Sequence, residues 1–145
     1  MKSCSVSEAE LCGCLVVASG HFQMMPTTDK RLGYFARLQS PYLNTTGQCV
    51  ELFYWMDASA DEAVLSIITI TEEKEEQLAA RTIGQPMPGW NRLFAPALPS
   101  GVYQIVIEGK RGSVSFTGLA VDDIIVQSCE KFGKTNTNVF CIFRF

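Results

Sequence analysis

The chain has 145 residues and a formal net charge of −3; 47% of its residues are hydrophobic and 19% are charged. This length suits one domain, and the composition is that of a globular protein, which excludes disorder throughout the chain. The twelve Lys and Arg residues are scattered, so the chain lacks the basic stripe with which proteins neutralise nucleic-acid phosphates. Its longest apolar runs are four or five residues, against the roughly 20 that a membrane-spanning helix needs, so no span is expected.

The first 18 residues do not have the pattern of a secretion signal. Lys2 supplies a basic residue, but Glu8 and Glu10 lie where the apolar region should begin. The apolar run at 15–18 is too short to replace that region. We therefore expect the sequence to be a fragment or a truncated form of a longer protein.

The cysteines of the two ends have no clear partners in the sequence. Cys4, Cys12 and Cys14, together with His21, could nominally supply the ligands of a zinc site. Structural zinc sites usually separate paired cysteines by two to four residues, whereas one residue separates Cys12 from Cys14. Free or irregularly oxidised thiols are the favoured interpretation, with His21 as a structural residue rather than a general base. Cys141 has no predicted partner.

The middle of the chain alternates strand patterns with turn-forming Gly and Pro residues. Segment 49–56 is apolar on both faces, as expected of a strand between two layers, and segment 64–71 is rich in β-branched residues. Seven or eight short strands at this spacing predict an all-β chain folded as an antiparallel sandwich or jelly roll. We expect strands over residues 21–25, 33–38, 49–56, 64–71, 90–95, 103–108 and 119–126.

Residues 72–81 form a charged segment whose composition favours a helix. Within it, Leu78, Ala79 and Ala80 are the residues that could face a core. We expect a solvated hairpin loop or a single exposed helical turn here, rather than a packed helix.

Two further cysteines flank the strongest apolar strands. Cys49 opens segment 49–56, and Cys129 follows the strand that ends near Val126. Two cysteines that are far apart in the sequence, each attached to a core strand, suggest a covalent staple across a β-fold. A disulfide that closes so long a loop would stabilise the native state by roughly 4 kcal/mol. It would also imply an oxidising compartment.

Six blocks of the sequence, in the right order, resemble the MAM domain family, a module of the extracellular parts of receptors and membrane proteases. The last block, Gly-Leu-Ala-Val-Asp-Asp-Ile, is similar to a signature of that family and is followed by its closing cysteine, Cys129. The family's opening strand has no counterpart, so the resemblance covers 19–129 and leaves 1–18 and 130–145 as unmatched segments. The blocks lie at residues 19–24, 36–41, 49–56, 89–92, 103–109 and 118–124.

The resemblance implies a jelly-roll-like β-sandwich whose first strand is missing, with a disulfide between Cys49 and Cys129. It implies an adhesion or oligomerisation module in the ectodomain of a larger membrane or secreted protein, with protein partners or self-association. It implies no catalytic role. Nor does the sequence contain a phosphate-binding loop, a nucleophile elbow or a zinc-protease motif, so it gives no support for an enzyme.

The adjacent acids Asp122 and Asp123 are the most obvious polar pair. Neighbouring side chains on a strand point to opposite faces, so the two cannot form a catalytic dyad. Some relatives of the family hold a hard cation between first-strand acids and an aspartate of this block, and those first-strand donors are absent here. We expect no cofactor, with one carboxylate accepting loop N–H groups and the other solvated. A structural Ca²⁺ or other cation at Asp122 and Asp123 is the alternative.

Asn44-Thr45-Thr46 is an N-glycosylation sequon in a turn-like stretch, which predicts a glycoprotein if the chain passes through the secretory route. Trp55 and Trp90 lie within apolar strands and are expected to anchor the core rather than to bind a ligand.

The first functional hypothesis is therefore a non-catalytic adhesion or assembly module of an extracellular region. The second, from a different class, is a calcium- or carbohydrate-dependent ligand-binding jelly roll. A third is a non-functional product of a partial gene or variant transcript.

Overall fold

The computed structural model describes residues 23–26, 33–56, 62–84, 87–112 and 118–132. Within these ranges the regular structure is almost entirely strand, which confirms the predicted all-β class. The strands are β1 (Gln23–Pro26), β2 (Phe35–Gln39), β3 (Leu43–Thr45), β4 (Gln48–Met56), β5 (Val64–Thr71), β6 (Glu76–Ile83), β7 (Asn91–Ala95), β8 (Gly101–Lys110) and β9 (Gly118–Ser128), and the short 3-10 helix η2 (Cys129–Lys131) follows β9.

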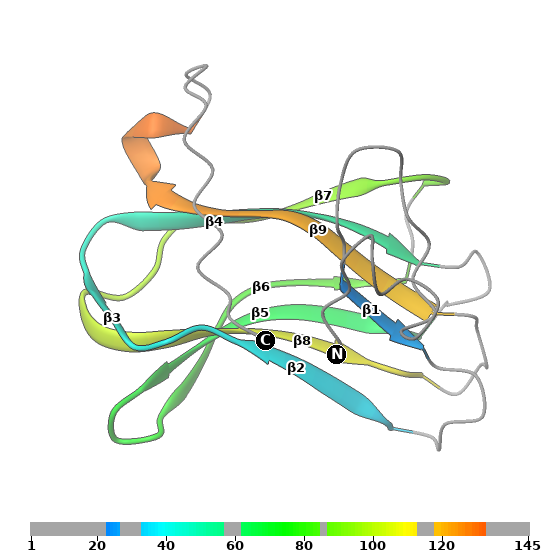
Figure 1. Ribbon diagram of the computed structural model, residues 1–145, viewed down its shortest axis with the longest axis horizontal. Helices are drawn as coiled ribbons and strands as arrows, with labels where there is room; N and C mark the ends of the chain where they lie inside the picture. Colours follow the sequence, from blue (N-terminus) through cyan, green and yellow to red (C-terminus); the bar gives the residue numbers. More distant parts are fainter. Residues whose placement is uncertain (1–22, 27–32, 57–61, 85–86, 113–117, 133–145) are drawn as a thin grey trace, which may run out of the picture.

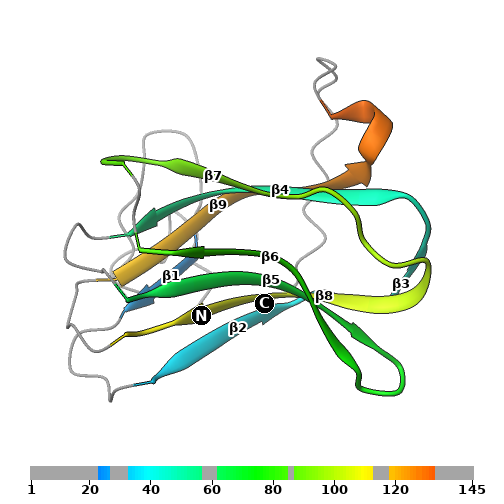
Figure 2. The ribbon, with the colours of Figure 1, turned by 180° about the vertical axis from the view of Figure 1, so that it is seen from behind.

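The strands form two antiparallel sheets that lie face to face (Figure 1; Figure 2 shows the same layers from behind). The first sheet has the order β1-β9-β4-β7, and the second has the order β2-β8-β5-β6, with β3 also paired to β8. Apart from β3 and the β5–β6 hairpin, successive strands alternate between the sheets. This is the connectivity of a double-sheet jelly roll, so the predicted β-sandwich is confirmed.

Alternate residues of both sheets fill the space between the layers. In β4, Val50, Leu52, Tyr54 and Met56 are buried, and the residues between Val50 and Met56 point to the outer face. The prediction that this strand would be buried on both faces is therefore wrong for its outer side. The core cluster also contains Met25, Ala36, Leu38, Ala63, Leu65, Ile67, Leu93, Ala95, Leu98, Tyr103, Ile105, Ile107, Leu119, Val121, Ile124 and Val126.

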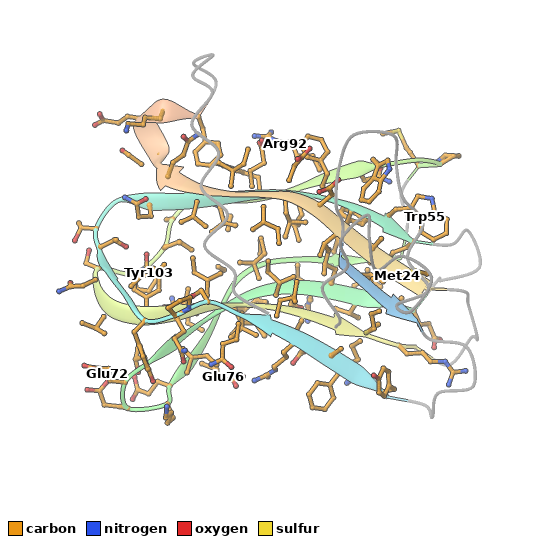
Figure 3. All side chains as sticks on the ribbon, viewed as in Figure 1. Met24, Trp55, Glu72, Glu76, Arg92 and Tyr103 are labelled. Carbon is orange, nitrogen blue, oxygen red and sulfur yellow. A yellow bond between two sulfur atoms is a disulfide. The ribbon has the colours of Figure 1, made fainter. Side chains whose placement is uncertain are left out.

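Two buried tyrosines satisfy their hydroxyl groups inside this core. The Tyr54 hydroxyl of the first sheet lies 3.2 Å from the Thr82 hydroxyl of the second, so this hydrogen bond joins the layers. The Tyr103 hydroxyl lies 2.7 Å from the hydroxyl of Thr45 on β3. Figure 3 shows Tyr103 between the two sheets. Burying these large rings without an unpaired hydroxyl keeps the apolar gain of each ring.

The charged segment 72–81 is mostly strand, not loop. Residues 72–75 form the turn of a hairpin, in which Lys74 has a positive φ of 67° and its N–H donates to the Thr71 carbonyl at 3.1 Å. From Glu76 onward the chain pairs with β5 as an edge strand. The hairpin-loop prediction is thus right for 72–75 and wrong for 76–81. If this segment were a solvated helix, the backbone N–H and C=O groups along one edge of β5 would be unpaired. Pairing of the segment with β5 satisfies those groups.

Candidate interaction surface

The covalent staple lies at one end of the first sheet. Cys49 on β4 and Cys129, directly after β9, form a disulfide between residues 80 apart in sequence, with Cα atoms 4.9 Å apart. The two strands pair directly, with Gln48 opposite Ser128, and the Cys129 N–H donates to the Gly47 carbonyl at 3.0 Å. The disulfide that the resemblance implied is therefore present, and it closes the sheet where β4 begins and β9 ends.

The outer face of the first sheet carries large apolar side chains. Phe53 and Trp55 of β4, Phe94 of β7 and Ile125 of β9 are half-buried there, and each alternates with a core residue. Phe53 lies opposite Arg92 across the β4–β7 pair. The pairing of β4 with β7 and with β9 places the other side chains of this set next to one another on the same face of the sheet. Figure 3 shows Met24, Trp55 and Arg92 on this sheet. We call the set Glu51, Phe53, Trp55, Arg92, Phe94 and Ile125 the aromatic face.

Arg92 organises the charged part of the aromatic face. Its guanidinium forms an ion pair with Glu51 across the β4–β7 ladder and lies 4.9 Å from the centroid of the Phe94 ring. Phe94 in turn meets Phe132 edge to face, with ring centroids 5.2 Å apart. Just over half of the Arg92 side chain remains exposed, against 16% for Glu51. The arginine is therefore oriented by the protein yet still able to contact another molecule.

The prediction that both tryptophans anchor the core is wrong. Trp90 precedes β7 and is 41% exposed. Trp55 is half-buried on the outer face of β4, because the core positions of that strand have the opposite parity. From Leu52 to Met56 both the odd and the even positions of β4 are apolar, so the sequence pattern did not say which side would be buried.

The acidic pair lies at a β-bulge in β9. Glu51 pairs with Ile125 and Phe53 with Asp122, so Asp123 and Ile124 together oppose a single residue of β4. Asp123 has a positive φ of 48° and is exposed, and its N–H donates to a carboxylate oxygen of Asp122 at 2.8 Å. Within the described ranges, no three His, Cys, Asp or Glu residues lie close enough to share a cation. Cation binding by Asp122 and Asp123 stays a prediction.

The outer face of the second sheet has a different character. Ile68, Ile70 and Val106 form a small apolar cluster there, and all three are buried. Arg37 of β2 donates to Glu108 of β8 at 2.7 Å and to Glu76 of β6 at 2.9 Å. These hydrogen bonds to the two carboxylates raise the pKa of Arg37.

The tip of the β5–β6 hairpin reaches the same side of the molecule. Lys74 donates to the Tyr42 hydroxyl at 2.9 Å, and this hydrogen bond raises the pKa of Lys74. Figures 1 and 2 show the hairpin tip projecting beyond the sheet on the side away from the other layer, and Figure 3 shows Glu76 on that side. The cluster is buried within the chain, and the Arg37 hydrogen bonds run from β2 to β6 across β8 and β5, the strands that carry it.

Asn44 lies in strand β3 rather than in a loop, which corrects the prediction about its surroundings. It pairs with Val102 of β8 and is exposed. Glycosylation of Asn44 stays a prediction.

The candidate zinc ligands Cys4, Cys12, Cys14 and His21, as well as Cys141, lie outside the described residues. The unmatched segment 1–18 lies outside them too, and of 130–145 only 130–132 are described. No helix in the described part of the chain has the length and apolar character needed to cross a bilayer.

Comparison with known proteins gives one consistent answer. A family model described as "MAM domain, meprin/A5/mu" matches residues 9–130, which includes the predicted unit 19–129 and starts before it. MAM domain-containing glycosylphosphatidylinositol anchor protein 1 of Rattus norvegicus and that of Mus musculus are each 30% identical over 115 residues. The protein of the same name from Homo sapiens is 29% identical over 119 residues.

Each of these matches covers 77% of this chain but only 12% of the relative. The similarity therefore concerns one module of much longer proteins. The region that the family model matches spans the strands of both sheets and both cysteines of the disulfide. The chain belongs to the MAM domain family.

Proposed function

We propose that the chain is a non-catalytic extracellular module that binds a protein partner through the aromatic face, as part of a larger membrane or secreted protein. The observation that carries the proposal is the aromatic face itself. Trp55, Phe53 and Phe94 lie beside a half-exposed Arg92 on the outer side of a sheet. Trp, Phe and Arg are the residue types enriched in the centres of protein–protein interfaces, where they supply most of the binding energy.

The scaffold beneath this surface supports a binding role. The aromatic face is built on β4, β7 and β9, whose other side is the packed core and whose end is closed by the Cys49–Cys129 disulfide. A surface on paired strands is held in one conformation before a partner arrives, so little entropy is lost in ordering it. The fixed ion pair between Arg92 and Glu51 adds a polar element that can select among partners.

An extracellular location is supported by two observations. Disulfides persist in oxidising compartments, and this one joins two core strands. The similar curated proteins are named for a glycosylphosphatidylinositol anchor. We propose that this chain is likewise part of a membrane-anchored protein. The anchor itself is a feature of those longer proteins.

The proposal is tested with purified, disulfide-bonded protein coupled to fluorescent beads and added to intact cells. We expect saturable binding that is lost when cell-surface proteins are removed with trypsin, because the partner is a protein. Sedimentation velocity of the same protein tests a second copy of the chain as the partner. Absence both of saturable binding and of self-association would overturn the proposal.

Matched variants locate the surface. Trp55→Ser and Arg92→Glu each change one residue of the aromatic face and should reduce binding at least tenfold, as expected of central interface residues. Leu78→Ser changes a residue that is 51% exposed on β6 of the other sheet and should bind as the natural chain does. Equal losses in all three variants would place the contact elsewhere.

A further inference from the structure

Asn44-Thr45-Thr46 is the one N-glycosylation sequon in the 145-residue sequence. In the structure it lies on β3 and the bend that follows, where Asn44 and Thr46 are both exposed. The acceptor amide and the hydroxyl residue two positions later are thus both on the surface. A sequon inside a packed strand would have neither group accessible.

The neighbours of Asn44 fix which side of the sheet it occupies. Leu43 packs against the main core, and the Thr45 hydroxyl is hydrogen-bonded to the buried Tyr103 at 2.7 Å. Because side chains alternate along a strand, Asn44 points to the opposite side, the outer face of the second sheet. A large group attached there would leave the core packing of Leu43 and Thr45 unchanged.

The compartment required for the modification is the one that the structure already indicates. Cys49 lies five positions after Asn44 and is oxidised to a disulfide with Cys129. Disulfides form in the same lumen in which N-glycans are attached, so a chain that acquires this bond in a eukaryotic secretory route also meets the glycosylation machinery.

We infer that Asn44 is an N-glycan attachment site and that its glycan shields the outer face of the second sheet near the hairpin tip. The Asn44 side-chain nitrogen forms a bond to C1 of the first sugar of a lipid diphosphate-linked oligosaccharide. The C1–oxygen bond to the diphosphate breaks, the lipid diphosphate leaves, and the nitrogen loses one proton. No oxidation or reduction is involved.

The position of the glycan divides the molecular surface in two. Tyr42, two residues before Asn44, holds the Lys74 amine of the hairpin tip, so the glycan begins beside that contact. The aromatic face belongs to the other sheet, so a glycan on Asn44 does not cover it. The glycan is therefore compatible with partner binding by the aromatic face, and it disfavours docking of a protein on the outer face of the second sheet.

The test is to secrete the chain from cultured animal cells behind a cleavable leader and to treat it with peptide N-glycosidase. We expect one glycan to be lost, with Asn44 converted to Asp in the peptide that contains it, as seen by mass spectrometry. Thr46→Val should remove the glycan and Thr46→Ser should retain it, because serine still completes the sequon. Secreted natural chain whose mass does not change on treatment would overturn the inference.

The variants separate a modification effect from a folding effect. Thr46 is exposed, so its replacement should leave the fold intact, and the mass shift of the natural chain is informative even if a variant is retained in the cell. This readout is independent of partner binding. If the chain carries the glycan but does not bind cells, the inference stands and the proposed function is contradicted. If the chain binds cells but carries no glycan, the proposed function stands and the inference is overturned.

Discussion

The outer faces of the two sheets show two ways in which a sandwich treats apolar residues that do not reach its core. On the second sheet, Ile68, Ile70 and Val106 are covered by the chain itself, with Arg37 bonded to both Glu76 and Glu108. On the first sheet, the rings of the aromatic face remain half-buried beside a half-exposed arginine. Apolar side chains on outer strand faces therefore contribute to stability on the second sheet, and in the proposed function they serve recognition on the first.

The largest expected effect is that of removing the disulfide that closes one end of the sheet carrying the aromatic face. Replacing Cys49 and Cys129 together by Ala should lower the free energy of unfolding by roughly 4 kcal/mol, because an 80-residue loop is no longer closed in the unfolded chain. Urea denaturation followed by tryptophan fluorescence measures this. A reductant should destabilise the natural chain by the same amount and leave the variant unaffected. Alkylation of both cysteines in unreduced secreted protein would contradict the prediction.

Each outer face carries an arginine, and replacing the two arginines in turn tests the comparison of the faces. Arg37→Ala should cost about 1 kcal/mol of stability, since it leaves two carboxylates without their partner and uncovers apolar surface. Arg92→Ala should cost less than about 0.5 kcal/mol, because this side chain is more exposed and its ion pair lies at the surface. Partner binding should show the reverse order. Thermal or urea unfolding of both variants, compared with the bead assay, provides the check.

An effect no larger than that of Arg37→Ala is expected at the bulge of β9. Asp123→Ala should destabilise by about 1 kcal/mol, because a residue with a Cβ but no locally bonding side chain adopts a positive φ at a cost. Asp123→Gly should be near neutral at the same position, since glycine accepts that backbone without strain. The two variants can be compared by urea midpoint. Equal stability of the two variants would mean that the positive φ at this position does not determine which residues it accepts.

The smallest expected effect is that of calcium. Asp122 already accepts a backbone hydrogen bond, and hard cations need several more oxygen ligands than two neighbouring aspartates provide. The melting temperature should therefore be unchanged between calcium and a chelator. A calcium-dependent rise that disappears in Asp123→Ala would instead support the calcium-dependent ligand-binding alternative.

Much of the fold could be predicted from the sequence because its signals are local. The β-branched residues of β5 and the alternation in β8 mark strands by composition, and the family blocks supply the link between Cys49 and Cys129. β6 could not be predicted in the same way, because its residues favour a helix and only pairing with β5 makes them a strand. Local composition does not contain that pairing.

The candidate interaction surface was harder to predict for a related reason. Trp55 was predicted to be a core residue because the last five residues of β4, Leu52 to Met56, are apolar at odd and even positions alike. Which parity faces inward depends on how β4 packs against the opposite sheet, which is a property of the whole sandwich. Arg92 gave no local signal at all, since its role depends on Glu51 and Phe94 from the paired strands.

The extra residue at Asp123 changes the phase of β9. Leu119 and Val121 face the core before it, and Ile124 and Val126 face the core after it, so the inward positions switch from odd to even numbers. Removing one residue here would rotate half of the strand by a half-turn and expose one of these two apolar pairs to water. The spacing of this strand is therefore less tolerant of change than the identity of either aspartate, and a deletion should be more damaging than any single replacement in the pair.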